Sequence, residues 1–284
     1  DNFDWKIKEE IIAYLASAFL DEIQLLLQDL TQGEDEANNY LKVLELDSKI
    51  DSFFLLDIDK VEELMIPSLQ KDSYVGIDPR ALLTSYIDYY QILKQIPSDE
   101  YLIDLGAGHC RGTLLSIIMK TSNCISYEFV NERVIRANEY INKFCIKNKT
   151  IDLIYSVDLG EVSIPKAYGY YLYFPRGRVL NHLLKQMIVL AESANIHLFV
   201  SESHGDVLSY IDRLGLNRIN EFKTSLPRHY EFIVNYQFSG PIYYNEINYL
   251  DNLPLWLLFN RDKYFVIHYY DVLNSEYIDW VVPA

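Results

Sequence analysis

The stretch that decides the fold reads Tyr101-Leu-Ile-Asp-Leu-Gly-Ala-Gly-His-Cys-Arg-Gly112. Its first five residues have the length and apolarity of a buried parallel strand. Gly106 and Gly108 then allow a tight turn and a close approach of a ligand to the backbone. Residues 110 to 120 follow a helical pattern. Because the strand end and helix N-terminus of such a β-α unit bind nucleotide-like ligands, the stretch predicts an open α/β sheet with a ligand at this turn.

The glycine spacing and an acid inside the motif distinguish between ligands. Asp104 stands near the end of the strand, where a dinucleotide-binding fingerprint normally has an aliphatic residue. In the pattern Gly-x-Gly-x-x-Gly, the third glycine lets helix and strand pack closely. Counting from Gly106, that place holds Arg111, and Gly112 comes one residue late. The spacing disfavours a dinucleotide such as NAD.

These residues resemble the first motif of the class I S-adenosylmethionine-dependent methyltransferases, a strand that ends in Asp-x-Gly-x-Gly. The motif here reads Asp104-Leu105-Gly106-Ala107-Gly108. The resemblance implies a Rossmann-like α/β fold with a seven-stranded, mostly parallel sheet and an antiparallel C-terminal hairpin. It also implies that the cofactor is S-adenosyl-L-methionine and that the five motif residues shape its pocket.

A second acid follows at the place where the family has one. Cys124-Ile-Ser-Tyr-Glu128-Phe predicts the next strand, and residues 131–148 predict the helix behind it. In the family, the acid that ends this strand binds the ribose hydroxyls. A carboxylate can accept from both hydroxyls in charge-assisted bonds, whereas it repels phosphate. The resemblance therefore assigns the ribose to Glu128. The basic residues of the following helix, Arg133 among them, we interpret as a solvated face.

The resemblance continues less specifically through two more strands. Residues 150–158 predict the third strand, and the family implies that Asp158 contacts adenine. Residues 168–175 predict the fourth strand, whose end borders the methyl acceptor in the family. The acceptor-edge candidates are therefore Tyr173, Phe174 and Pro175. Enzymes that methylate exocyclic base nitrogens usually have Asn or Asp before Pro-Pro here, so Tyr-Phe-Pro disfavours a DNA base as acceptor.

Residues 1–70 predict an acidic helical region in front of this core. Apolar residues recur at helical spacing over residues 5–30, and a second helical pattern covers about 40–48. A further helix is expected to end near residue 93, with Asp78 as its cap and Pro79 in its first turn. In the family, the turn before this helix lies beside the methionine end of the cofactor. Tyr74 is therefore another candidate for cofactor binding.

Residues 71–240 make up the methyltransferase-like core, and residues 241–284 a tyrosine-rich extension. Beyond the fourth strand, the core pattern predicts a helix at 178–193, a fifth strand at 196–201 and a helix at 205–214. Strands at 220–225 and 230–238 are expected to form the closing hairpin. The extension has strand-like stretches at 253–259 and 264–270.

Composition and charge narrow the classes of function. Half of the 284 residues are hydrophobic, enough for a large core, but no apolar run reaches the length of roughly 20 residues that spans a membrane. The three cysteines form no close pair, which favours a cytoplasmic location, and we assign no metal site. The net charge of -16 disfavours electrostatic binding to the phosphate backbone of nucleic acids. Residues 1–60 alone carry 15 acids against 5 lysines.

The sequence thus predicts a methyltransferase that transfers a methyl group to an oxygen or nitrogen of a protein or small molecule. RNA ranks behind these acceptors because of the acidic charge. No catalytic base is assigned, since orientation alone can supply much of the rate. Two alternatives stay open. One is an NAD-dependent oxidoreductase, and the other is a catalytically silent interaction protein whose acidic N-terminal region binds a basic partner.

Overall fold

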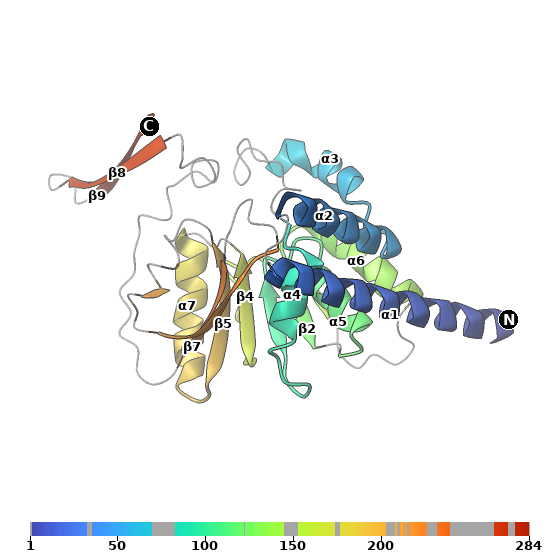
Figure 1. Ribbon diagram of the computed structural model, residues 1–284. Coiled ribbons are helices and arrows are strands. Elements are labelled where there is room, and N and C mark those ends of the chain that lie inside the picture. The colour runs from blue at the N-terminus through green and yellow to red at the C-terminus, as the bar shows by residue number, and fades with distance from the viewer. Residues whose placement is uncertain are drawn as a thin grey trace.

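A seven-stranded sheet lies at the centre of the computed structural model (Figure 1). The structure describes residues 2–32, 36–69, 83–121, 123–144, 153–173, 177–202, 216–225, 232–238, 264–271 and 276–283, with 208, 211, 212 and 214 between them. The predicted strand at 253–259 and most of the predicted helix at 205–214 lie outside the described residues.

The strands pair in the order β3-β2-β1-β4-β5-β7-β6. Neighbouring pairs among the first five strands are parallel, β7 runs antiparallel to β5, and β6 runs antiparallel to β7. This arrangement is the class I methyltransferase sheet that the resemblance implied, including its antiparallel C-terminal hairpin. The strands are β1 (Leu102–Leu105), β2 (Cys124–Glu128), β3 (Ile154–Ser156), β4 (Gly169–Tyr173), β5 (Ile196–Glu202), β6 (Asn217–Lys223) and β7 (Phe232–Phe238).

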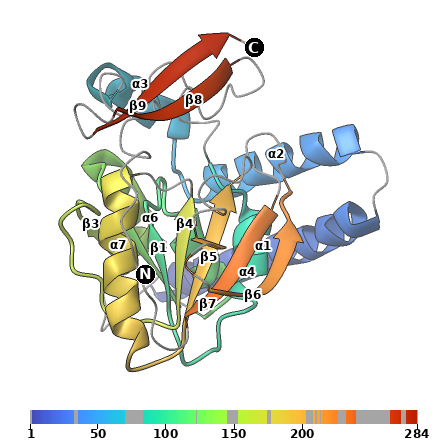
Figure 2. The ribbon, with the colours of Figure 1, turned by 90° about the vertical axis from the view of Figure 1, so that its left-hand side faces the viewer.

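Helices cover both faces of the sheet (Figure 2). Those of the described chain are α1 (Asn2–Gln32), α2 (Glu36–Phe53), α3 (Ile58–Leu69), α4 (Tyr86–Leu93), α5 (Arg111–Ile118), α6 (Asn131–Phe144) and α7 (Gly177–Ala191). Three helices before α4 confirm the helical character of the N-terminal region. No helix in the described parts of the chain is both long enough and apolar enough to cross a membrane.

The alternation of side chains along β1 divides the core into two layers. Leu102 belongs to the cluster that α1, α2, α4, α5 and α6 build on one face of the sheet. Ile103 and Leu105 belong to the cluster that α7 builds on the other face. Asp104 shares the face of Leu102, because its register partners are Ser126 and Tyr171. A carboxylate is therefore buried beneath α4 and α5.

The helix before the first strand begins later than the sequence pattern predicted. Leu83, Thr84 and Ser85 are not helical, and α4 starts at Tyr86. The Ser85 hydroxyl accepts from the backbone N–H of Asp88 at 3.1 Å and so caps the helix. Asp78 is therefore not its cap, nor is Pro79 in its first turn, and both lie outside the described residues.

A two-stranded antiparallel sheet follows in the C-terminal extension. It consists of β8 (Tyr264–Asp271) and β9 (Glu276–Pro283). The strand predicted at 264–270 is confirmed by β8.

Gly112 allows α4 and α5 to pack closely, which generates a stability prediction. A Cβ at this position would lie 2.8 Å from the Tyr89 ring and 3.1 Å from the Asp104 carboxylate. We expect Gly112→Ala to lower the free energy of unfolding by roughly 1–3 kcal/mol in urea titration. Gly108→Ala is the comparison, because its Cβ would meet nothing within 4 Å and only its positive φ opposes it. Equal costs would contradict crowding at Gly112.

Candidate functional site

The glycine turn is fastened to the end of the neighbouring strand. Gly106 and Gly108 have φ of 86° and 56°, values that side chains disfavour. The backbone N–H groups of Gly106 and Ala107 both donate to the carbonyl oxygen of Tyr127, at 2.8 and 3.0 Å. The turn therefore lies over the end of β2, next to Glu128.

The Glu128 carboxylate contacts the turn directly. Its Oε2 accepts from the backbone N–H of Gly108 at 2.7 Å, and its Oε1 accepts from that of Val130 at 2.8 Å. The Arg133 guanidinium lies farther away, with Nη1 at 3.5 Å from Oε1. A carboxylate has about four acceptor positions, so these contacts leave capacity for hydroxyl donors. The acid predicted from the second strand thus lies beside the predicted glycine turn.

Asp104 is buried at the base of the turn. The Tyr89 hydroxyl donates to its Oδ2 at 2.8 Å. Burial, offset in part by this hydrogen bond and reinforced by the charge of Glu128, raises the pKa of Asp104 to about 7. Burial also raises the pKa of Tyr89, which therefore remains a donor. Through its hydrogen bond with Tyr89, Asp104 links the strand that leads into the turn to α4.

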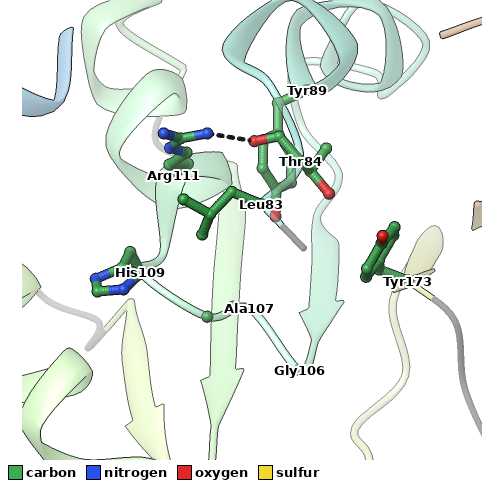
Figure 3. Close-up of a pocket in the computed structure, with 9 residues that line it drawn as sticks. Leu83, Thr84, Tyr89, Gly106, Ala107, His109, Arg111 and Tyr173 are labelled. Atoms are coloured by element: carbon green, nitrogen blue, oxygen red, sulfur yellow. Dashed lines mark hydrogen bonds between the residues drawn. The ribbon is translucent and has the colours of Figure 1, made fainter. Parts of the chain in front are cut away.

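A pocket opens beside the glycine turn (Figure 3). Tyr173, at the end of β4, and His109 lie on opposite sides of the turn. The pocket therefore joins the predicted cofactor turn to the predicted acceptor edge. Its lining consists of Leu83, Thr84, Tyr89, Gly106, Ala107, Gly108, His109, Arg111 and Tyr173.

Arg111 connects the turn to the N-terminal region. Its Nε and Nη2 donate to the Asp51 carboxylate, and its Nη1 donates to Asp47 at 3.3 Å and to the Thr84 carbonyl at 2.9 Å. The guanidinium also lies over the Tyr86 ring, 5.1 Å from its centroid. The arginine at the start of α5 thus holds α2 against the core.

Glu62 of α3 makes a second connection, between the turn and α6. Its Oε1 lies 2.7 Å from His109 Nε2, and its two oxygens accept from Arg133 Nε and Nη2 at 2.8 and 3.0 Å. Burial by itself would raise the pKa of Glu62. The hydrogen bonds and charges of His109 and Arg133 outweigh this effect and lower the pKa to about 2. Burial lowers the pKa of His109, so the neutral imidazole donates through Nε2.

These two connections are the part of the site that the sequence did not predict. The interpretation of Arg133 as part of a solvated face is wrong, since its side chain is only 5% exposed. Its pairing with Glu62 explains the burial. Asp47, Asp51 and Glu62 are three acids among many in an acidic region, so the sequence did not mark them as partners of the core. Arg111, an arginine inside the glycine motif, was the one residue that could have indicated such a pair.

Other predicted site residues lie in different surroundings. Leu105 packs on the α7 side of the sheet, away from the pocket lining. Asp158 is exposed and accepts from the backbone N–H of Gly160 at 2.7 Å, which closes a turn after β3. Its contact with adenine stays a prediction. Tyr74, Phe174 and Pro175 lie outside the described residues.

Comparison with known proteins finds likeness only at the level of structure. The sequence matches no protein-family model and no curated protein. A SAM-dependent methyltransferase from Aquifex aeolicus is 15% identical, with 64% of this chain and 98% of that one covered and a TM-score of 0.41. The B. subtilis tRNA methyltransferase TrmK is 13% identical, with 54% of this chain and 65% of that one covered and a TM-score of 0.40.

A third similar structure is the magnesium protoporphyrin IX methyltransferase ChlM from Synechocystis PCC 6803 with bound SAH. It is 16% identical, with 53% of this chain and 78% of that one covered and a TM-score of 0.36. Because identities and scores are this low, the fold rests on the strand order of the sheet itself.

Ionisation of Asp104 should make stability depend on pH. Its folded pKa of about 7 exceeds its ordinary value of 3.8, so between these values the folded protein binds more protons. Stability from this group is therefore lost as pH rises through about 7, by at most about 1.4 kcal/mol per pH unit.

We expect Asp104→Asn, which keeps an acceptor for Tyr89, to become more stable relative to the wild type between pH 5 and pH 8. Urea titrations across this range measure the difference. Asp99→Asn, at an exposed position, is the control. A stability difference that stays constant over the range would contradict the buried, protonated acid.

Proposed function

We propose that this protein is an S-adenosylmethionine-dependent methyltransferase that acts on an oxygen or nitrogen nucleophile. The observation that carries the proposal is the 2.7 Å contact between Glu128 and the backbone of Gly108, at the strand ends of a β3-β2-β1-β4-β5-β7-β6 sheet. The contact joins the motif acid of the second strand to the glycine turn of the first. Strand ends of open α/β sheets are where such ligands bind.

The residues present fit this cofactor. Glu128 keeps acceptor capacity for ribose hydroxyls, and the positive φ values at Gly106 and Gly108 allow the backbone to approach a ligand closely. An acid at this place would repel the phosphates of other nucleotides. Asp158, two residues beyond β3, is our candidate for adenine, and Tyr74 for the methionine end.

The cofactor would supply the electrophilic methyl group on its sulfonium. The task of the chain is then to hold and orient the reactants, which can contribute roughly 7–11 kcal/mol. Tyr173 would border the acceptor, together with Phe174 and Pro175. Because burial raises the pKa of Tyr173, its hydroxyl would orient the acceptor as a neutral group.

For the acceptor, we favour a protein or a small molecule over RNA. The net charge of -16 disfavours binding to the phosphate backbone of RNA. Three acids of the N-terminal region, Asp47, Asp51 and Glu62, are engaged with arginines of the core. The alternative of a silent protein that uses this region to capture a basic partner therefore loses some of its support.

The cofactor assignment predicts that Glu128→Gln weakens binding of S-adenosylhomocysteine by at least about tenfold, since the amide loses the charge-assisted bonds to ribose. Isothermal titration calorimetry measures the change. Glu132→Gln, exposed at the start of α6, is the matched control and should bind as the wild type does. Unchanged affinity in Glu128→Gln would remove Glu128 from this role.

Thermal-shift measurements separate the rival cofactors. We expect S-adenosylhomocysteine to raise the melting temperature and NAD to leave it unchanged, because ligands stabilise the state that binds them. The reverse pattern would support an oxidoreductase.

Methyl transfer itself can be followed with labelled S-adenosylmethionine in a size-fractionated lysate. We expect label in the protein or small-molecule fraction. Label in the RNA fraction would overturn our ranking of acceptors, and background label in every fraction, despite cofactor binding, would support a silent protein.

A further inference from the structure

Arg133 is shared between two carboxylates that come from distant parts of the chain. Its Nε and Nη2 bond both oxygens of Glu62, a residue 71 positions earlier, while only Nη1 faces Glu128. The bidentate pair holds the guanidinium in one orientation. All three side chains are buried, with exposures of 5%, 2% and 6% for Arg133, Glu62 and Glu128.

This division of contacts leaves Glu128 available to a ligand. A guanidinium that faced Glu128 with two donors would occupy the acceptor positions that hydroxyls need. At 3.5 Å, Nη1 supplies positive charge without taking that place.

The groups around Glu128 come from several elements. The turn contributes the Gly108 N–H and the buried thiol of Cys110, β1 contributes Asp104, and α6 contributes Arg133. Among these groups only Arg133 is cationic. Its position is fixed by Glu62 of α3, which also bonds His109 in the turn.

We propose that Glu62 and Arg133 are positioning residues for ribose recognition: Glu62 holds Arg133 back so that Glu128 keeps its oxygens available for the two hydroxyls. The inference rests on the proposed function. It makes an N-terminal helix, which contributes no motif residue, a component of the cofactor site.

The test compares S-adenosylhomocysteine with its 2′,3′-dideoxy analogue by calorimetry. The ratio of the two affinities measures ribose recognition alone, because the rest of the ligand is the same. In Glu62→Gln the neutral amide no longer holds Arg133, which turns toward Glu128. We expect S-adenosylhomocysteine to bind at least about tenfold more weakly, the analogue to bind nearly unchanged, and the ratio to fall accordingly.

Glu63→Gln is the matched control, since Glu63 is the exposed neighbour on the same helix. A second pair of variants addresses the contact between Arg133 and Glu128. Arg133→Met removes the cation beside Glu128 and should lower the affinity ratio. Arg133→Lys keeps a cation at this position and should restore part of the ratio.

The outcomes separate this inference from the function on which it rests. If the wild type discriminates between the ligands and the Glu62→Gln ratio falls, positioning is supported. If both ligands weaken equally in Glu62→Gln, or if the Met and Lys variants of Arg133 have the same affinity ratio, positioning is overturned while the methyltransferase proposal stands. If the wild type binds neither ligand, the cofactor assignment fails, and the inference with it.

Discussion

The structure depends on buried ion pairs between acids of the N-terminal helices and arginines of the core. Asp47 and Asp51 of α2 meet Arg111, and Glu62 of α3 meets Arg133. Removing one partner of such a pair leaves an uncompensated buried charge, which typically costs about 3–5 kcal/mol. The N-terminal helices are therefore fastened to the core beside the glycine turn, because Arg111 and Arg133 lie in the first turns of α5 and α6.

Much of the sheet followed from local sequence. A short apolar run with a glycine turn predicted β1 and α5, and each later strand was expected within a few residues of its observed place. The family resemblance added that the sheet has seven strands and is mostly parallel with an antiparallel C-terminal hairpin, whereas the strand order came from the structure. The contact between Glu128 and Gly108 was predictable as proximity, since the carboxyl ends of adjacent parallel strands meet at one edge of a sheet.

The rest required three-dimensional information. Spacing could show that Gly112 comes one residue late, but not that the space is needed for the Tyr89 ring. The start of α4 was misplaced because Asp78 and Pro79 are good start signals, whereas the Ser85 cap has none of their prominence. The ion pairs are harder to predict from sequence than the helix start. A surface arginine and a buried arginine look alike in sequence, and the acid that pairs with a buried one lies up to 71 residues away here.

The order of the ion pairs along the chain has a consequence for biosynthesis. Asp47, Asp51 and Glu62 leave the ribosome well before Arg111 and Arg133 do. Until those cations emerge, burying the three carboxylates would cost free energy that nothing offsets. Docking of α2 and α3 is therefore expected to follow the synthesis of α5 and α6. The ion pairs thus tie the folding of an earlier segment to that of a later one.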